Sequence, residues 1–236
     1  MIRGFYTSLS GIVAAMTRQS VVADNLANVN TVGFHQSTTT SGDFCVALAQ
    51  SSGASIGRIG TAAIATGLTM DRAQGTLEST GEPSDLAIEG DGLFVVATPT
   101  GIAGTRAGNF TVDASGLLVT ANGYPVLDTV GQPIATGGTF TVNPDGTVAG
   151  TGQRIAVTGW PTGEPVRLGQ GLIDLGGFTT PAGGMVRQGN LERSNTDVAA
   201  AMTELVSLQR QFGLSSRALS IQDETLGDVA QLGRLR

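Results

Sequence analysis

The chain has 236 residues, a net charge of −6 and only 14% charged residues. All 13 basic residues are arginines, which excludes Schiff-base chemistry and the lysine of a phosphate-binding P-loop. An acidic chain with no basic stripe is also not expected to bind nucleic acid. The length is enough for one sizeable domain, or for a β domain with an extension.

The first predicted element, in residues 1–36, is an amphipathic helix. Polar residues such as Arg18 and Asp24 share it with one apolar stripe, which should therefore find a partner. Residues 25–34 supply three asparagines and a glycine, residue types that end helices. The stripe recurs at alternating spacings of four and three, a heptad pattern, and consists of Phe5, Leu9, Ile12, Met16, Ala23 and Leu26, with Gln19 in the same register.

Residues 37–75 are dominated by Ser, Thr, Gly and Ala, a composition that favours an extended connector. The alternative is a poorly patterned part of the domain that follows. Neither interpretation places chemistry in this stretch.

Residues 76–185 alternate short apolar runs with turn signals, which predicts an antiparallel all-β domain. Hairpin-type turns are expected at 91–92, 122–123 and 145–146, where Asp-Gly and Asn-Gly pairs occur. The expected strands are 86–88, 93–98, 110–112, 117–120, 140–142, 147–148 and 154–158.

Residues 186–236 predict a second amphipathic helix, with a capping-box start in 194–197. Its stripe repeats every seven residues, with Met202 and Leu208 thickening it: Val198, Leu205, Phe212, Leu219 and Leu226. Two terminal helices with matching stripes should pack together. Further apolar residues beside each stripe indicate neighbours from other subunits, and the alternative is a pair of ordinary core helices.

The predicted fold class is therefore mixed α and β. Residues 1–36 and 186–236 should form a discontinuous coiled-coil domain of terminal helices, 37–75 a connector, and 76–185 a central all-β domain.

Candidate catalytic groups have simpler structural explanations. His35 and Cys45 could form a nucleophile and base pair, but a partly exposed loop histidine is the simpler interpretation. Asp85, Glu89 and Asp91 could act as glycosidase carboxylates, but each lies beside a glycine or at a strand boundary, where turn formation and capping account for it. We therefore predict no catalytic residue, no metal site, no cofactor and no small-molecule substrate.

Neither a secretory leader nor a stretch of transmembrane length is expected, which by itself favours a cytoplasmic protein.

Four stretches form a pattern that resembles one known family. Residues 25–34 read Asn-Leu-Ala-Asn, two variable residues, Thr, Val32, Gly and Phe, where Val32 replaces a more common proline. The matching residues are Asn25, Leu26, Ala27, Asn28, Thr31, Gly33 and Phe34, then Gly90, Gly92, Phe94, Arg106, Gly108, Asn109 and Phe110, and finally Gly189, Leu191, Glu192, Ser194 and Asn195. In this order they resemble the bacterial flagellar basal-body rod proteins and the related hook proteins.

The resemblance implies a structural subunit that polymerises helically through its terminal helices into the hollow drive shaft of the rod. The implied partners are the chain itself, other rod and hook subunits and the flagellar export apparatus. It also implies a location in the flagellar basal body, reached by type III export without a cleaved signal peptide. Two alternatives are a hook or hook–filament connecting protein and a secreted carbohydrate-binding or hydrolytic β domain.

Overall fold

The computed structural model describes residues 2–43, 63–138, 140–161, 163–176 and 183–234. Side chains are not described for 2–8, 41–43, 63–66, 222, 223 and 226–234. The chain forms two compact units. The helical unit consists of the described parts of 1–27, 37–69 and 197–236, and the β unit of 28–36 and 70–196.

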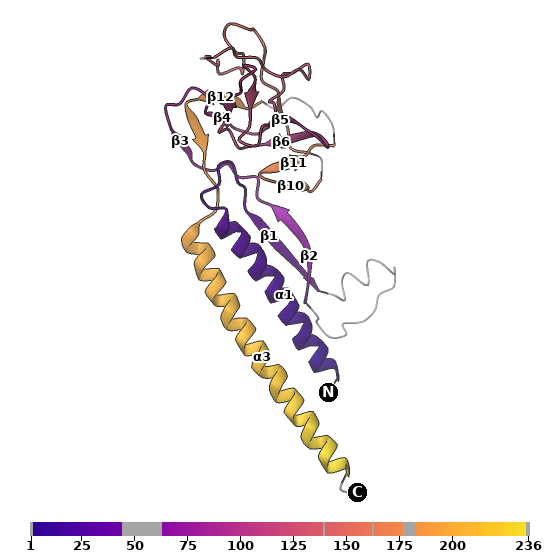
Figure 1. Cartoon of the computed structure of the whole chain (residues 1–236). Coiled ribbons are helices and arrows are strands. Elements are labelled where there is room, and N and C mark those ends of the chain that lie inside the picture. Colours follow the sequence, from indigo (N-terminus) through magenta and orange to yellow (C-terminus); the bar gives the residue numbers. More distant parts are fainter. Residues whose placement is uncertain (1, 44–62, 139, 162, 177–182, 235–236) are drawn as a thin grey trace. The chain divides into compact units, whose positions relative to one another are not determined.

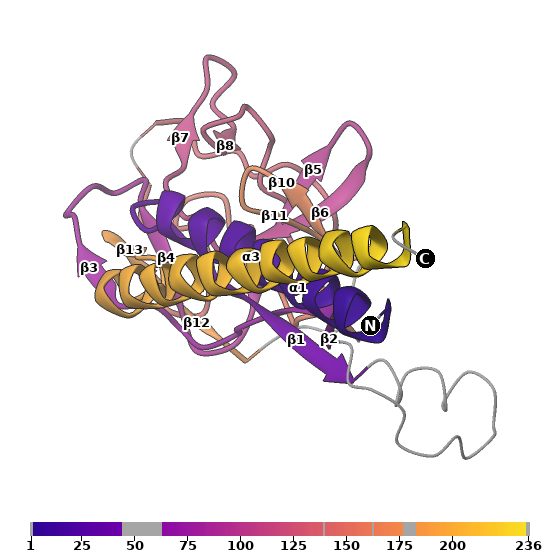
Figure 2. The ribbon, with the colours of Figure 1, turned by 90° about the horizontal axis from the view of Figure 1, so that it is seen from below.

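The helical unit contains α1 (Ile2–Ala27) and α3 (Val198–Arg234). They lie side by side and antiparallel, with the N-terminus of α1 and the C-terminus of α3 at the same end (Figures 1 and 2). The side chain of Asp197 accepts hydrogen bonds from the backbone N–H groups of Ala199 and Ala200, at 2.9 and 3.3 Å, which makes Asp197 the N-cap of α3. The expected capping box started at Ser194, so the helix begins later than the sequence pattern indicated.

The same unit includes a two-stranded sheet of β1 (Ser37–Asp43) and β2 (Ala63–Met70), with β1 packed near α1. The hydroxyl groups of Thr38 and Thr69 lie 2.9 Å apart across it. These residues fall in the predicted connector, and the β-branched threonines explain why part of it forms strands instead. The side chain of Asn25 joins β1 to the end of α1, because its Nδ2 donates to Ser37 O at 2.7 Å and its Oδ1 accepts from Ser37 N at 2.9 Å.

The β unit is antiparallel at every described strand pair, as predicted. One five-stranded sheet has the order β10-β11-β6-β5-β9, and three small sheets pair β12 with β4, β13 with β3, and β7 with β8. Asp91-Gly92 is not a hairpin turn, since β4 pairs with β12 and not with β5. The strands are β3 (Leu77–Ser79), β4 (Leu86–Glu89), β5 (Leu93–Thr98), β6 (Gly101–Thr105), β7 (Thr111–Val112), β8 (Leu118–Val119), β9 (Val157–Thr158), β10 (Arg167–Gly169), β11 (Leu172–Asp174), β12 (Met185–Gln188) and β13 (Asn190–Glu192).

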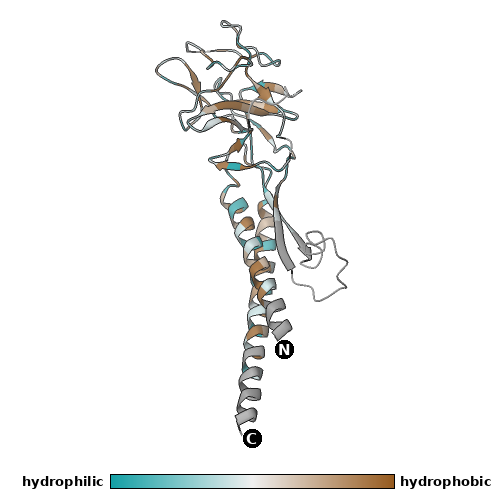
Figure 3. Cartoon of the chain, turned by 90° about the vertical axis from the view of Figure 1, so that its right-hand side faces the viewer, coloured by the Kyte–Doolittle hydropathy of each residue, from teal (hydrophilic) through white to brown (hydrophobic). Residues whose placement is uncertain are grey.

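Strand β5 is the centre of the core because both of its faces are covered. Side chains alternate between the faces of a strand, so Phe94 and Val96 enter one apolar cluster while Leu93 and Val95 enter another. In the first cluster the rings of Phe94 and Phe110 meet edge to face at 5.2 Å. Figure 3 shows the strands at the centre of the β unit in brown, the colour of apolar residues.

The boundaries of the β unit are wider than the predicted 76–185. The backbone N–H of Gly33 donates to the carbonyl of Glu192 at 2.8 Å, and that of Asp71 to the carbonyl of Gln36 at 2.9 Å. Residues 28–36, assigned from the sequence to the N-terminal helix segment, therefore complete the β unit. Strands β12 and β13 extend past residue 185 because they are the pairing partners of β4 and β3.

Candidate assembly site

The contact between α1 and α3 is built from small and medium apolar residues. Val22, Ala201 and Leu208 are buried together, with Leu205 half-buried against them. Ala201 and Leu208 are seven residues apart, so they lie on one face of α3. An alanine in such a contact lets two helix backbones approach closely, and Ala15 on α1 is also buried.

Of the predicted stripe residues, Leu208 is buried in this contact and Leu205 is half-buried against it, but most of the others are not buried there. Leu9, Met16, Met202 and Phe212 are 40, 54, 53 and 37% exposed. The helices do pack together, but through a neighbouring face, because heptad spacing does not reveal which apolar face meets the partner. The remaining stripe residues divide into exposed Val198 and Ala23, half-buried Ile12, Leu26, Leu205 and Leu219, and Phe5 and Leu226, whose side chains lie outside the described part.

Both helices therefore present apolar side chains to solvent in the single chain. Val13, Val206, Leu214 and Ile221 add to this exposed set and are 46 to 68% exposed. Exposed apolar residues in such number are typical of a surface that binds another protein. Among the described residues, no helix is long and apolar enough to cross a membrane.

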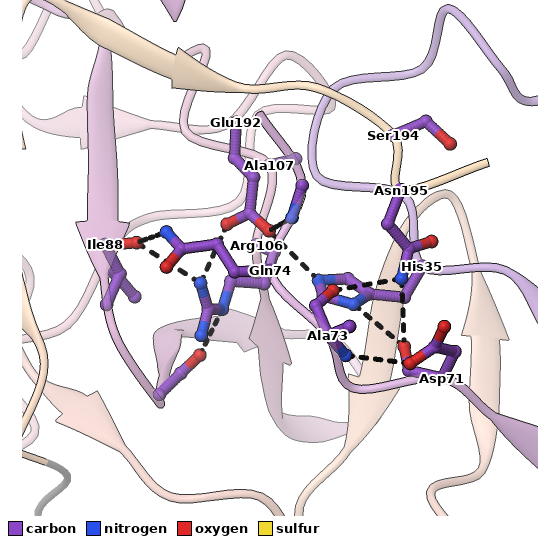
Figure 4. Close-up of polar contacts among 12 residues, drawn as sticks. His35, Asp71, Ala73, Gln74, Ile88, Arg106, Ala107, Glu192, Ser194 and Asn195 are labelled. Carbon is purple, nitrogen blue, oxygen red and sulfur yellow. Dashed lines mark hydrogen bonds and ion pairs between the residues drawn. The ribbon is translucent and has the colours of Figure 1, made fainter. Parts of the chain in front are cut away.

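A second feature, inside the β unit, is a buried group of charged side chains (Figure 4). Nη1 of Arg106 lies 2.7 Å from Oε2 of Glu192, and both side chains are 1% exposed. The same guanidinium group donates to the carbonyls of Ile88, Gly90 and Gly92. Arg106 thus ties the turn between β4 and β5 to the carboxylate of β13.

His35 belongs to this group and is not the partly exposed loop residue that the sequence suggested. Its side chain is 2% exposed, and Nε2 lies 3.3 Å from Oε1 of Glu192, at ion-pair distance but without hydrogen-bond alignment. Its Nδ1 lies 3.0 Å from the backbone oxygen of Asp71. The possible partner Cys45 lies outside the described residues.

The carboxylate of Glu192 is the centre of this cluster. Burial raises the pKa of Glu192, but the contact with His35, the charge of Arg106 and the N–H of Gly75 together outweigh burial and hold the pKa below its ordinary value of 4.5. Glu192 is therefore an anion at neutral pH, enclosed by two basic side chains and a backbone donor.

Glycines of the motif make room for the cluster. A Cβ on Gly33, which has φ of +65°, would lie 2.2 Å from the backbone carbon of Arg106. A Cβ on Gly108 would lie 1.5 Å from the backbone oxygen of Leu86. Only glycine permits these approaches. The motif residues at 33, 90, 92, 106 and 192, widely separated in sequence, thus meet in one place. Asn195 joins them through its side chain, which accepts from Gln36 N at 2.7 Å and donates to the carbonyl of Ala73 at 2.9 Å.

Two of the acidic residues considered for catalysis have other partners. Asp85 accepts a hydrogen bond from the Thr80 hydroxyl at 2.6 Å, and Glu89 lies 2.7 Å from Nε of Arg187 in an exposed ion pair. Within the described residues, no three His, Cys, Asp or Glu side chains gather as a metal ion would require.

Sequence reasoning missed the burial of His35 and the meeting of Arg106 with Glu192. The available signal was a charged residue close to a motif glycine, since Arg106 lies two residues before Gly108 and Glu192 three residues after Gly189. A glycine indicates that another part of the backbone packs closely against that segment, so a charged side chain beside it is expected to be buried and paired.

Comparisons with known proteins agree with this distribution of motifs. Residues 5–35 match the model described as flagella basal body rod protein, 87–150 the flagellar hook protein FlgE/F/G D1 domain, and 187–232 the flagellar basal body rod FlgEFG protein C-terminal. The flagellar basal-body rod protein FlgG of Bacillus subtilis is 34% identical over 99% of this chain and 100% of its own length. FlgG of Borreliella burgdorferi is 30% identical over 99% and 100%, and FlgF of Mesorhizobium japonicum 32% identical over 95% of both chains. With relatives at this identity over their full length, the chain belongs to the family of bacterial flagellar basal-body rod proteins.

Proposed function

We propose that this chain is a structural subunit of the bacterial flagellar rod and that it assembles through its terminal helices. The observation that carries the proposal is the exposed apolar set of α1 and α3, which includes Leu9, Met16, Met202 and Phe212. Full-length relatives that are themselves named rod proteins support the same role.

The assembly contact is heterologous: the face of one copy meets a different face of the next. A contact of this kind, repeated with a fixed rotation and rise, gives an open helical assembly. Each large apolar side chain that is fully buried contributes about 1.5–3 kcal/mol. The four residues named above are 37 to 54% exposed in the single chain, so completing their burial supplies roughly half of that amount for each, about 3–6 kcal/mol per subunit before the cost of association.

In this proposal α1 and α3 form coiled coils with the helices of neighbouring subunits. The contact surface consists of the two predicted stripes, one from Phe5 to Leu26 and the other from Val198 to Leu226. The β unit is carried outside the shaft. The chain has no enzymatic activity, reaches the basal body through the flagellar export apparatus, and contacts copies of itself and other rod or hook subunits.

The test is Phe212→Asp in cells that carry no other copy of the gene. Phe212 is 37% exposed in the single chain, so the new carboxylate stays hydrated there and the β unit should keep its thermal unfolding midpoint. In the assembled rod the same carboxylate would be buried without a partner, at a cost of several kcal/mol. We expect loss of swimming and of rods beyond this subunit, while the variant is still exported.

Gln211→Asp is the matched control, because it places the same charge on an exposed polar position of α3 one residue away. It should leave swimming intact. Normal swimming of the Phe212→Asp strain, or equal loss with both variants, would remove the basis of the proposal.

A further inference from the structure

The ring of His35 lies between two oxygen atoms, one at hydrogen-bond distance and one at ion-pair distance. Nδ1 lies 3.0 Å from the carbonyl oxygen of Asp71, and Nε2 lies 3.3 Å from Oε1 of Glu192. A neutral imidazole has one N–H, so one ring nitrogen would turn a lone pair toward an acceptor, in a site that water does not reach. The imidazolium form carries an N–H on each side of the ring and a positive charge at ion-pair distance from the Glu192 carboxylate.

The charges around the ring favour this form from one side and oppose it from the other. Glu192 and the carboxylate of Asp71 attract a positive His35. Arg106 lies beyond Glu192 and shares its carboxylate. Two further cations lie nearby. Arg167 donates to the backbone oxygen of His35. The guanidinium group of Arg72 lies 5.6 Å from the centre of the ring of Trp160, which itself contacts His35.

The position of His35 gives it contacts with chain segments that are far apart in sequence. Its own segment, 33–36, is bonded to Glu192 O through Gly33 N and to Asn195 Oδ1 through Gln36 N. The Asp71 N–H donates to the carbonyl of Gln36 at 2.9 Å. The segments 33–36, 71–75 and 190–195 therefore meet at one histidine, in the view of Figure 4.

We propose that His35 is a proton-dependent clasp of the β unit, which holds these three segments together as an imidazolium ion and releases segment 33–36 when it loses one proton. The clasp is closed while the ring is doubly protonated and opens when the ring becomes neutral. Protonation of Glu192 removes the anion that His35 faces, and since the pKa of Glu192 is lowered, this acid limit lies below 4.5.

The experiment is an NMR titration of the full chain, which is direct because the chain has one histidine and one tryptophan. Ring nitrogen shifts report the proton count of His35. Amide hydrogen exchange, corrected for its intrinsic pH dependence, reports the closure of Gly33, Gln36 and Asp71. We expect exchange of these amides to rise at least tenfold in step with proton loss from His35, while the Val95 amide, bonded to Ala156 O in the core, keeps its protection. Exchange that is flat across the histidine titration would overturn the proposal.

Two variants separate the charge from mere packing. His35→Gln has no charge, so the three amides should exchange at the fast level at every pH. His35→Lys keeps a fixed charge, so protection should persist through the range in which the wild type opens. The emission of Trp160, whose ring meets His35 edge to face at 5.3 Å, should follow the same step in the wild type only. A pH step that persists in His35→Gln assigns the effect to another group and refutes the clasp. If His35→Gln fails to fold, the wild-type titration still decides.

Discussion

Replacing Glu192 by glutamine should destabilise the β unit far more than the loss of one ion pair at the surface would. The carboxylate lies 2.7 Å from Arg106, accepts the Gly75 N–H at 3.0 Å and faces His35. Glutamine keeps one oxygen acceptor but no charge, so Arg106 remains buried and without its counter-ion. Breaking a buried pair from one side costs about 3–5 kcal/mol. With a urea dependence of about 2 kcal/mol per molar, the unfolding midpoint should fall by about 1.5–2.5 M.

Fluorescence of Trp160, the single tryptophan of the chain, follows unfolding of the β unit in urea. The matched control is Glu89→Gln, because Glu89 and Arg187 have the same 2.7 Å separation but side chains that are 47 and 57% exposed. Exposed pairs contribute little, so this variant should unfold close to the wild-type midpoint. Equal midpoints for Glu192→Gln and the wild type would refute the reasoning that burial makes the Arg106 pair critical.

Four further outcomes are expected. The folded state lowers the pKa of Glu192, so the ionised carboxylate stabilises the fold above the ordinary value of 4.5, and this stabilisation is lost as the pH falls through the lowered value. The urea midpoint of the wild type should therefore decrease when the pH falls below 4.5. In Glu192→Gln the decrease should be less steep. Gly33→Ala should lower the thermal midpoint of the β unit, since its Cβ would lie 2.2 Å from backbone. Gly213→Ala, with nothing within 4 Å of its Cβ, should instead stabilise α3 by about 0.5–1 kcal/mol, as read from the helical circular dichroism signal. Trypsin should cut the folded chain at exposed Arg210 before it cuts at buried Arg106, as mass spectrometry of early fragments can show.

The elements that the sequence predicted well are those whose signal is local. The apolar stripes predicted both helices. The unbroken apolar run of residues 93–96 predicted β5, because such a run is typical of a strand that is covered on both faces. Strand β6 was missed, because its sequence Gly-Ile-Ala-Gly-Thr has two glycines and little β propensity. It forms through its pairing with β5.

Long-range pairing explains the other differences. Residues 185–192 form β12 and β13 because β4 and β3 offer open edges, a fact invisible in a local window. Heptad spacing identified apolar stripes, but a small residue such as Ala201 carries too weak an apolar signal to mark the face on which the helices meet. The sequence suggested a partly exposed His35 because the segments of Asp71 and Glu192, which bury it, come to it only in the folded unit.

The central claim, that the exposed apolar faces of the terminal helices build the rod, is tested most directly by cryo-electron microscopy of isolated basal bodies that contain this chain. We predict density for α1 and α3 in the wall of the shaft, with the side chains of Leu9, Met16, Met202 and Phe212 buried against neighbouring subunits and the β unit outside them. A map in which the chain is part of the rod but these four side chains remain in solvent, or in which the β unit makes the shaft wall, would contradict the account.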